Sequence, residues 1–120
     1  MTTPIYLAAD FYKLSHREQY PKGTTVVYST LTPRSNKYAP WSDKIVFFGL
    51  QYFIKEYLID RFNKEFFQVP IEEVIETYTS FVKNTLGKQE VDVQHLVDLH
   101  KLGYLPLEIK ALPEGTLAPM

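Results

Sequence analysis

Two segments of the sequence are predicted to form β-strands, and they lie far apart in the chain. Residues 24–32 (TTVVYSTLT) are rich in β-branched side chains, which favour a strand. In residues 105–111 (LPLEIKA), apolar side chains alternate with Pro, Glu and Lys, as in a strand with one buried face. Two strands do not form a stable sheet alone. We therefore expect an unfinished sheet, and a chain that is the N-terminal part of a longer protein.

Three helices are predicted between these strands. Residues 46–62 are the most apolar part of the chain and have apolar side chains around most of the helix, which indicates a largely buried helix. Residues 70–87 begin with Pro, carry one apolar stripe and end with Gly, as expected of an amphipathic helix. Asp92 is predicted to cap a third helix that ends at Gly103. Together with a short N-terminal helix, this order of elements gives the α+β class.

The short N-terminal helix is predicted over residues 10–20 (DFYKLSHREQY), with Asp10 as its N-cap and a proline directly after it. Tyr12, His16 and Tyr20 are four residues apart and would share one face. A helix that only supports a core has a wider apolar stripe than this one. We therefore expect the helix to present side chains to a ligand or to another subunit.

Composition excludes several classes of protein. The chain has 120 residues, of which 45% are hydrophobic and 22% charged, and this suits one folded domain. Its formal net charge of -1 gives no long-range attraction to nucleic acid or to an anionic membrane. There is no cysteine, no basic N-terminal region typical of a signal peptide, and no apolar run long enough to span a membrane. We expect a soluble, cytoplasmic protein.

The three histidines do not have the spacing of a metal site. His95 and His100 are five residues apart, which points them to different faces of a helix, and no cysteine could complete a site. His100 shares a side with apolar residues and is expected at the edge of the core. The sequence has no glycine-rich phosphate loop and no nucleophile elbow. We therefore expect no metal ligand in this chain.

Asp10, Tyr12 and Arg34 are the candidate binding residues, and each has two interpretations. Arg34 follows the predicted strand at the start of a loop, where it could bind phosphate or form a surface ion pair. Its position alone favours the ion pair. Asp10 and Tyr12 could contact a ligand, but by sequence alone a capping carboxylate and a half-buried ring are the simpler interpretation.

Three stretches of the chain resemble one enzyme family. Residues 9–21 (ADFYKLSHREQYP) resemble the opening of nicotinamide phosphoribosyltransferases, whose pattern is close to Thr-Asp-x-Tyr-Lys-x-x-His-x-x-Gln-Tyr-Pro. Residues 47–52 (FFGLQY) and 103–115 (GYLPLEIKALPEG) resemble the same family in the same order. Ala9 and Phe11 depart from the family pattern, whereas the residues between and after them match it.

The resemblance implies an enzyme that joins nicotinamide to 5-phosphoribosyl-1-pyrophosphate (PRPP), giving nicotinamide mononucleotide and pyrophosphate for NAD biosynthesis. It implies a homodimer in which Tyr12 stacks on the nicotinamide ring in the partner's site and Asp10 lies near the carboxamide. Arg34 would reach phosphate groups across the same dimer. Mg²⁺ would accompany PRPP in the full-length enzyme, and ATP is a further candidate cofactor.

On this resemblance, residues 1–120 are the N-terminal domain of a larger type II phosphoribosyltransferase fold and end before its catalytic barrel domain. The family's catalytic histidine and main pyrophosphate-binding residues would lie beyond Met120, so we expect the isolated chain to bind no cofactor and to have no turnover. Two alternatives stay open. One is a nicotinate phosphoribosyltransferase-like enzyme, which Asp10 argues against, and the other is a non-catalytic dimerisation or interaction module.

Overall fold

The structure is a computed structural model that describes residues 3–87 and 89–120. Its elements, in chain order, are η1 (Ile5–Leu7), η2 (Phe11–Gln19), β1 (Lys44–Phe47), α1 (Leu50–Phe53), η3 (Ile54–Arg61), η4 (Asn63–Phe67), α2 (Ile71–Leu86), α3 (Gln94–Leu102) and β2 (Thr116–Pro119). η1 and η2 are 3-10 helices, whereas the π-helical segments η3 and η4 continue α1 as one long helix. Helices together with a two-stranded sheet confirm the α+β class.

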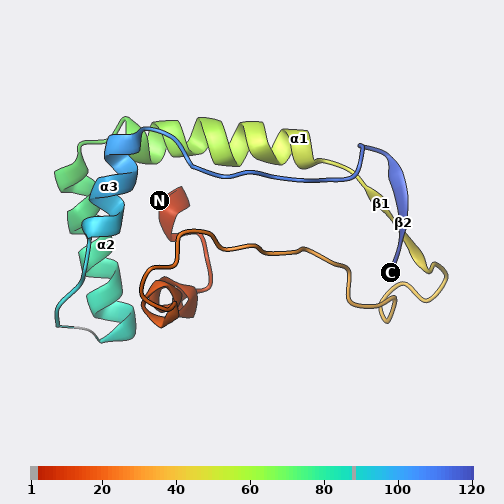
Figure 1. The fold of residues 1–120 in the computed structure, drawn as a ribbon, viewed down its shortest axis with the longest axis horizontal. Helices are drawn as coiled ribbons and strands as arrows, with labels where there is room; N and C mark the ends of the chain where they lie inside the picture. Colours follow the sequence, from red (N-terminus) through yellow and green to blue (C-terminus); the bar gives the residue numbers. More distant parts are fainter. Residues whose placement is uncertain (1–2, 88) are drawn as a thin grey trace.

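The molecule is elongated (Figure 1). η2, α2 and α3 gather at one end, the sheet of β1 and β2 lies at the other, and the long helix that begins with α1 spans the distance between them. The radius of gyration is 17.4 Å, whereas a compact domain of this length has about 14 Å. The accessible surface is 9743 Å², whereas a compact 14.0 kDa protein exposes about 6,700 Å². Roughly 3,000 Å² is therefore available for contact with further protein.

The core lies at the helical end of the molecule. The buried hydrophobic side chains among the described residues are Leu7, Phe66, Val74, Tyr78, Val82 and Leu96. Three of them come from α2 at intervals of four residues, because the apolar stripe of that helix faces the other helices. The helix ends at Gly87, whose φ of 66° is a left-handed conformation that glycine adopts without steric cost. The helix predicted over residues 70–87 is confirmed.

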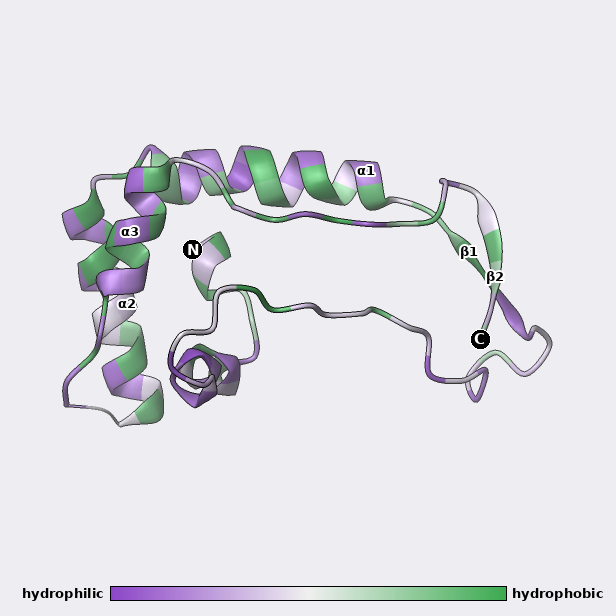
Figure 2. Cartoon of the chain, viewed as in Figure 1, coloured by the Kyte–Doolittle hydropathy of each residue, from purple (hydrophilic) through white to green (hydrophobic). Residues whose placement is uncertain are grey.

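The long helix starts later, and is more exposed, than the sequence predicted. Residues 44–47 form β1, and Gly49, with a φ of 96°, separates this strand from α1. Tyr52 and Phe53 are 63% and 47% exposed, so the prediction of a largely buried helix over residues 46–62 is wrong. Hydrophobic residues recur along this helix (Figure 2), and the described chain supplies too few elements to cover them.

Both predicted strands are wrong. Residues 24–32 and 105–111 run as extended chain (Figure 1), but neither forms a strand, because neither is hydrogen-bonded to a neighbouring strand among the described residues. The observed sheet instead pairs β1 with β2 in antiparallel register, with Lys44 opposite Pro119 and Phe47 opposite Thr116. Strand formation requires a partner at the right distance, and composition does not specify that partner.

α3 ends before Gly103, as predicted, but its N-cap is Val93 and not Asp92. Asp92 lies just before this helix, and its Oδ1 accepts the backbone N–H of Gln94 at 2.9 Å. His100 lies at the edge of the core, as expected. Its Nε2 is 2.8 Å from the carbonyl oxygen of Val69, and its ring meets that of Phe66 edge to face, with centroids 5.4 Å apart. This histidine therefore helps to pack α3 against the end of the long helix.

Candidate functional site

Asp10 directly precedes η2 and keeps its carboxylate exposed. It occupies the predicted N-cap position, but its side chain accepts no capping hydrogen bond; its backbone carbonyl instead accepts the N–H of Lys13 at 2.9 Å. Its Oδ2 lies 3.9 Å from Nζ of Lys13, and the two side chains are 65% and 55% exposed. An ion pair this exposed is weak. The carboxylate of Asp10 is therefore free to accept hydrogen bonds from a ligand.

Tyr12 lies in the first turn of η2 and is 52% exposed. Its ring packs against that of His16, with centroids 5.4 Å apart and an interplanar angle of 59°. The expected proximity of Tyr12 and His16 is therefore confirmed, whereas Tyr20 follows η2 as its C-cap, with extended backbone. Oγ of Ser15 donates a hydrogen bond to the carbonyl oxygen of Tyr12 at 2.8 Å. One side of the Tyr12 ring is supported by the helix, and the remainder is open to a flat ligand.

The other side of η2 is fixed to the helical body. Leu14 packs against the buried core, and η2 lies beside α2 (Figure 1). Nη2 of Arg17 is 2.9 Å from Oδ2 of Asp92, which ties η2 to the start of α3. Two hydrogen bonds lower the pKa of Asp92. The backbone N–H of Gln94 in α3 has the larger effect, and the side chain of Arg17 has the next largest. η2 is thus held in place while Asp10 and Tyr12 stay exposed.

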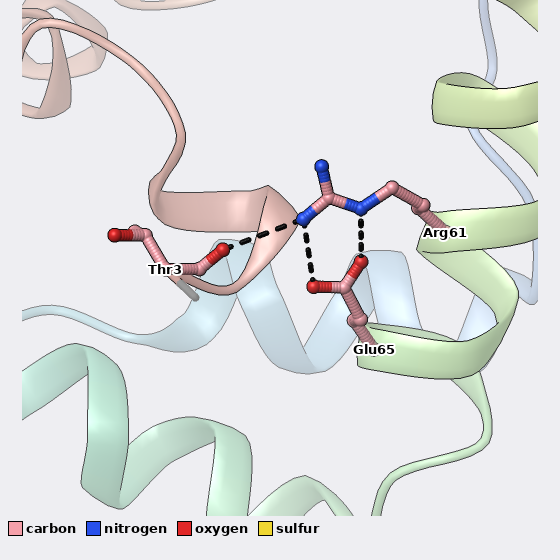
Figure 3. Close-up of polar contacts among 3 residues, drawn as sticks. All are labelled: Thr3, Arg61 and Glu65. Atoms are coloured by element: carbon pink, nitrogen blue, oxygen red, sulfur yellow. Dashed lines mark hydrogen bonds and ion pairs between the residues drawn. The ribbon is translucent and has the colours of Figure 1, made fainter. Parts of the chain in front are cut away.

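A second ion pair anchors the chain before η1 (Figure 3). Nε and Nη2 of Arg61 donate to Oε2 and Oε1 of Glu65 at 2.6 Å and 3.0 Å, and Nη2 also donates to the carbonyl oxygen of Thr3 at 3.4 Å. The hydrogen bonds from Arg61 lower the pKa of Glu65 and raise that of Arg61 itself. This arrangement fixes the start of the segment that leads into Asp10.

Arg34 is exposed and forms no hydrogen bond or ion pair with another described residue. The surface ion pair considered for it is therefore not formed within the described chain. It forms no hydrogen bond, ion pair or ring contact with Asp10 or Tyr12 either. A guanidinium in this state can take two oxygens of a phosphate in a bidentate arrangement.

Two grooves lie elsewhere among the described residues. The larger, of about 660 Å³, runs between residues 25–31 and 106–110. The smaller, of about 370 Å³, lies between the long helix and residues 103–109. Neither groove is lined by a candidate binding residue. In the part of the chain that the structure describes, no three His, Asp or Glu side chains are grouped to hold a metal ion, and no helix is long and apolar enough to cross a membrane.

Sequence reasoning missed the residues that hold the candidate site in place. Arg61 and Glu65 are four residues apart on one helix, a spacing that predicts a pair. The ion pair of Arg17 with Asp92 joins residues 75 positions apart, and no local pattern predicts it. Glu114 was also missed; its carboxylate accepts backbone N–H groups at the start of α1, which lowers its pKa.

Comparison with known proteins agrees with the resemblance noted in the sequence. Residues 4–109 match the family model described as nicotinamide phosphoribosyltransferase, N-terminal domain. The nicotinamide phosphoribosyltransferase of Acinetobacter baylyi is 50% identical over 117 residues, covering 94% of this chain and 23% of the relative. That of Xanthomonas campestris pv. campestris is 31% identical over 117 residues, covering 96% of this chain and 22% of the relative. No solved structure matches the chain.

The chain therefore spans less than a quarter of the length of these curated relatives. The family match includes the segments that carry all three candidate binding residues. Because the match covers most of its length, the chain belongs to the nicotinamide phosphoribosyltransferase family and corresponds to its N-terminal domain.

Proposed function

We propose that residues 1–120 form the N-terminal domain of an enzyme that transfers the phosphoribosyl group of PRPP to nicotinamide, within a larger type II phosphoribosyltransferase fold. The products are nicotinamide mononucleotide, for NAD biosynthesis, and pyrophosphate. The observation that carries the proposal is the start of η2, where Asp10 and Tyr12 are exposed on a helix whose opposite side is fixed to the core. Family membership supports the choice of substrates.

Asp10 and Tyr12 would recognise the nicotinamide base. An ionised carboxylate only accepts hydrogen bonds, so Asp10 suits the amide N–H of nicotinamide and would repel the carboxylate of nicotinate. Tyr12 offers a flat aromatic surface to an electron-poor pyridine ring, and its contact with His16 holds that surface in one orientation. Two contacts of different chemistry would thus select both the ring and its substituent.

The second subunit of a homodimer would complete the pocket. The candidate residues do not line either of the two grooves named above, and their side chains are exposed, so a base held by them needs walls from elsewhere. A standard protein interface buries about 800 Å² on each partner, and the excess surface of this chain is larger than that. Arg34 would reach the phosphate groups across the same interface, since its guanidinium has no described partner.

The reaction is a displacement at C1 of the ribose, in which a C–N bond to nicotinamide forms and the C–O bond to pyrophosphate breaks. When bound with PRPP, Mg²⁺ would offset the charge of the leaving pyrophosphate. On the family resemblance, the residues that would hold this ion, and any that would bind ATP, lie outside residues 1–120. The chain contributes recognition, and we expect no turnover from it alone.

Asp10→Asn tests the proposal. The protein is produced from its whole gene and assayed with PRPP and Mg²⁺, with nicotinamide and nicotinate in parallel. We expect the wild type to prefer nicotinamide. A hydrogen bond to a charged group contributes about 1.5–3 kcal/mol, so the substitution should narrow the kcat/KM ratio of the two bases roughly 10- to 150-fold. Asp43→Asn alters an exposed carboxylate outside η2 and serves as the matched control.

Each other outcome of this assay leads to a different conclusion. If Asp10→Asn left the kcat/KM ratio of nicotinamide to nicotinate unchanged, Asp10 would have no role in recognising the amide. A wild type that prefers nicotinate would indicate a nicotinate phosphoribosyltransferase-like enzyme. Product from neither base would indicate a non-catalytic dimerisation or interaction module.

A further inference from the structure

We propose that a β-strand from sequence beyond residue 120 occupies the groove between residues 24–32 and 105–111 and hydrogen-bonds to both segments. The groove has a volume of about 660 Å³ and is lined by side chains from both sides. The two segments lead in the same direction, from the helical end of the molecule towards the sheet (Figure 1). This inference concerns the fold and does not depend on the reaction proposed above.

The backbones on both sides of the groove are available for pairing. Residues 25–31 form no backbone hydrogen bond with another described residue. In residues 106–111, the backbone hydrogen bond formed among the described residues joins near neighbours: the N–H of Leu107 donates to the carbonyl oxygen of Leu105 at 2.8 Å. Unpaired extended backbone is a template for strand addition, because each N–H and C=O gains a partner. A strand placed between the two segments would satisfy both edges together.

The side chains of the groove also require cover. Val26 and Tyr28 are each 79% exposed, and Leu107 is 60% exposed, although all three line the groove. β-branched and aromatic residues stabilise a sheet when they pack beside a neighbouring strand. The strand propensity that the sequence shows in both segments is thus unused in the described chain, and an inserted strand would use it.

The strand that fits must come from outside these 120 residues. β1 and β2 are already paired with each other, so neither is free to enter the groove of a second copy. The other strand-like segments of a second copy are the two that line its own groove. The curated relatives are more than four times longer than the region they share with this chain, and that region matches the N-terminal domain of the family. The relatives therefore have ample sequence after it to supply a strand.

Amide hydrogen exchange in the protein made from its whole gene is the first test. We expect amides of residues 25–31 and 106–110 to exchange more than about 100-fold slower than those of the loop at residues 36–42. Amides of α2 serve as the folded reference, since that helix carries much of the core. Exchange in both segments as fast as in the loop would overturn the proposal.

Photo-crosslinking in the same full-length protein identifies the occupant. A photoreactive benzoylphenylalanine replaces Tyr28, which lines the groove, and in a matched control it replaces Tyr38, which is 87% exposed and outside the groove. We expect an intrachain cross-link from position 28 to a residue after 120, and no such link from position 38. A covalent dimer, a link to residues 105–111, or no link from position 28 would overturn the proposal.

Discussion

Replacing Tyr12 by alanine in the full-length protein should weaken nicotinamide binding without unfolding the domain. The ring is 52% exposed and packs against His16 on one side, so it can stack with a single pyridine ring. One stacking contact of this kind contributes about 1–3 kcal/mol, which corresponds to a roughly 5- to 150-fold rise in the KM for nicotinamide. Because Tyr12 lies outside the buried core, the free energy of unfolding should change by less than about 0.5 kcal/mol.

Initial rates over a nicotinamide series at saturating PRPP measure this KM, and urea denaturation checks the fold. Tyr12→Phe keeps the ring and should keep the KM near that of the wild type. Phe11→Ala removes a neighbouring ring of almost equal exposure, 53%, and should leave the KM unchanged. A Tyr12→Ala variant with an unaltered KM, or an equal rise in Phe11→Ala, would refute the stacking role.

Three further predictions concern stability. Phe66→Ala removes a fully buried ring and should lower the free energy of unfolding in urea by about 3–5 kcal/mol, whereas Tyr38→Ala in an exposed loop should change it by less than about 0.5 kcal/mol; equal effects would contradict the assigned core. The pKa of His95 is lowered below 6.5, mainly by burial of its ring and to a smaller extent by the positive charge of Arg17. The unfolded chain then binds the proton more readily, so the free energy of unfolding should fall as the pH drops below about 6.5. His95→Gln should flatten this pH dependence between about pH 7.5 and 5.5. An unchanged slope would count against a lowered pKa of His95 in the folded protein. Glu114→Ala removes the acceptor for backbone N–H groups at the start of α1, so amide exchange should accelerate there and not in α2.

The helices of this protein were largely predictable because their signals are local. Apolar residues four apart define α2, and Gly87 ends it with a backbone conformation that few other residues adopt. Asp92 marks the start of α3 through a hydrogen bond to a residue two positions along the chain. Each of these interactions joins neighbours in sequence, so the pattern of residue types specifies the structure almost completely.

The candidate site was predictable in part. The family resemblance pointed to Asp10, Tyr12 and Arg34, and the spacing of Tyr12 and His16 predicted the contact between their rings. The narrow apolar stripe of residues 10–20 predicted that this helix exposes side chains. The unpaired state of Arg34 could not be predicted, since it depends on which other residues come near it. The ion pair of Arg17 with Asp92 likewise depends on how two helices meet.

The sequence by itself therefore determined α2, the C-terminal end of α3 and the family to which the chain belongs, but not the bounds of the long helix. The tertiary structure decided which extended segments become strands. Residues 24–32 have the composition of a strand and remain unpaired, whereas residues 44–47, of which 46 and 47 were expected to begin a helix, pair with residues 116–119 and form the sheet. The physical reason is that a helix satisfies its hydrogen bonds within one segment, whereas a strand needs a second segment beside it.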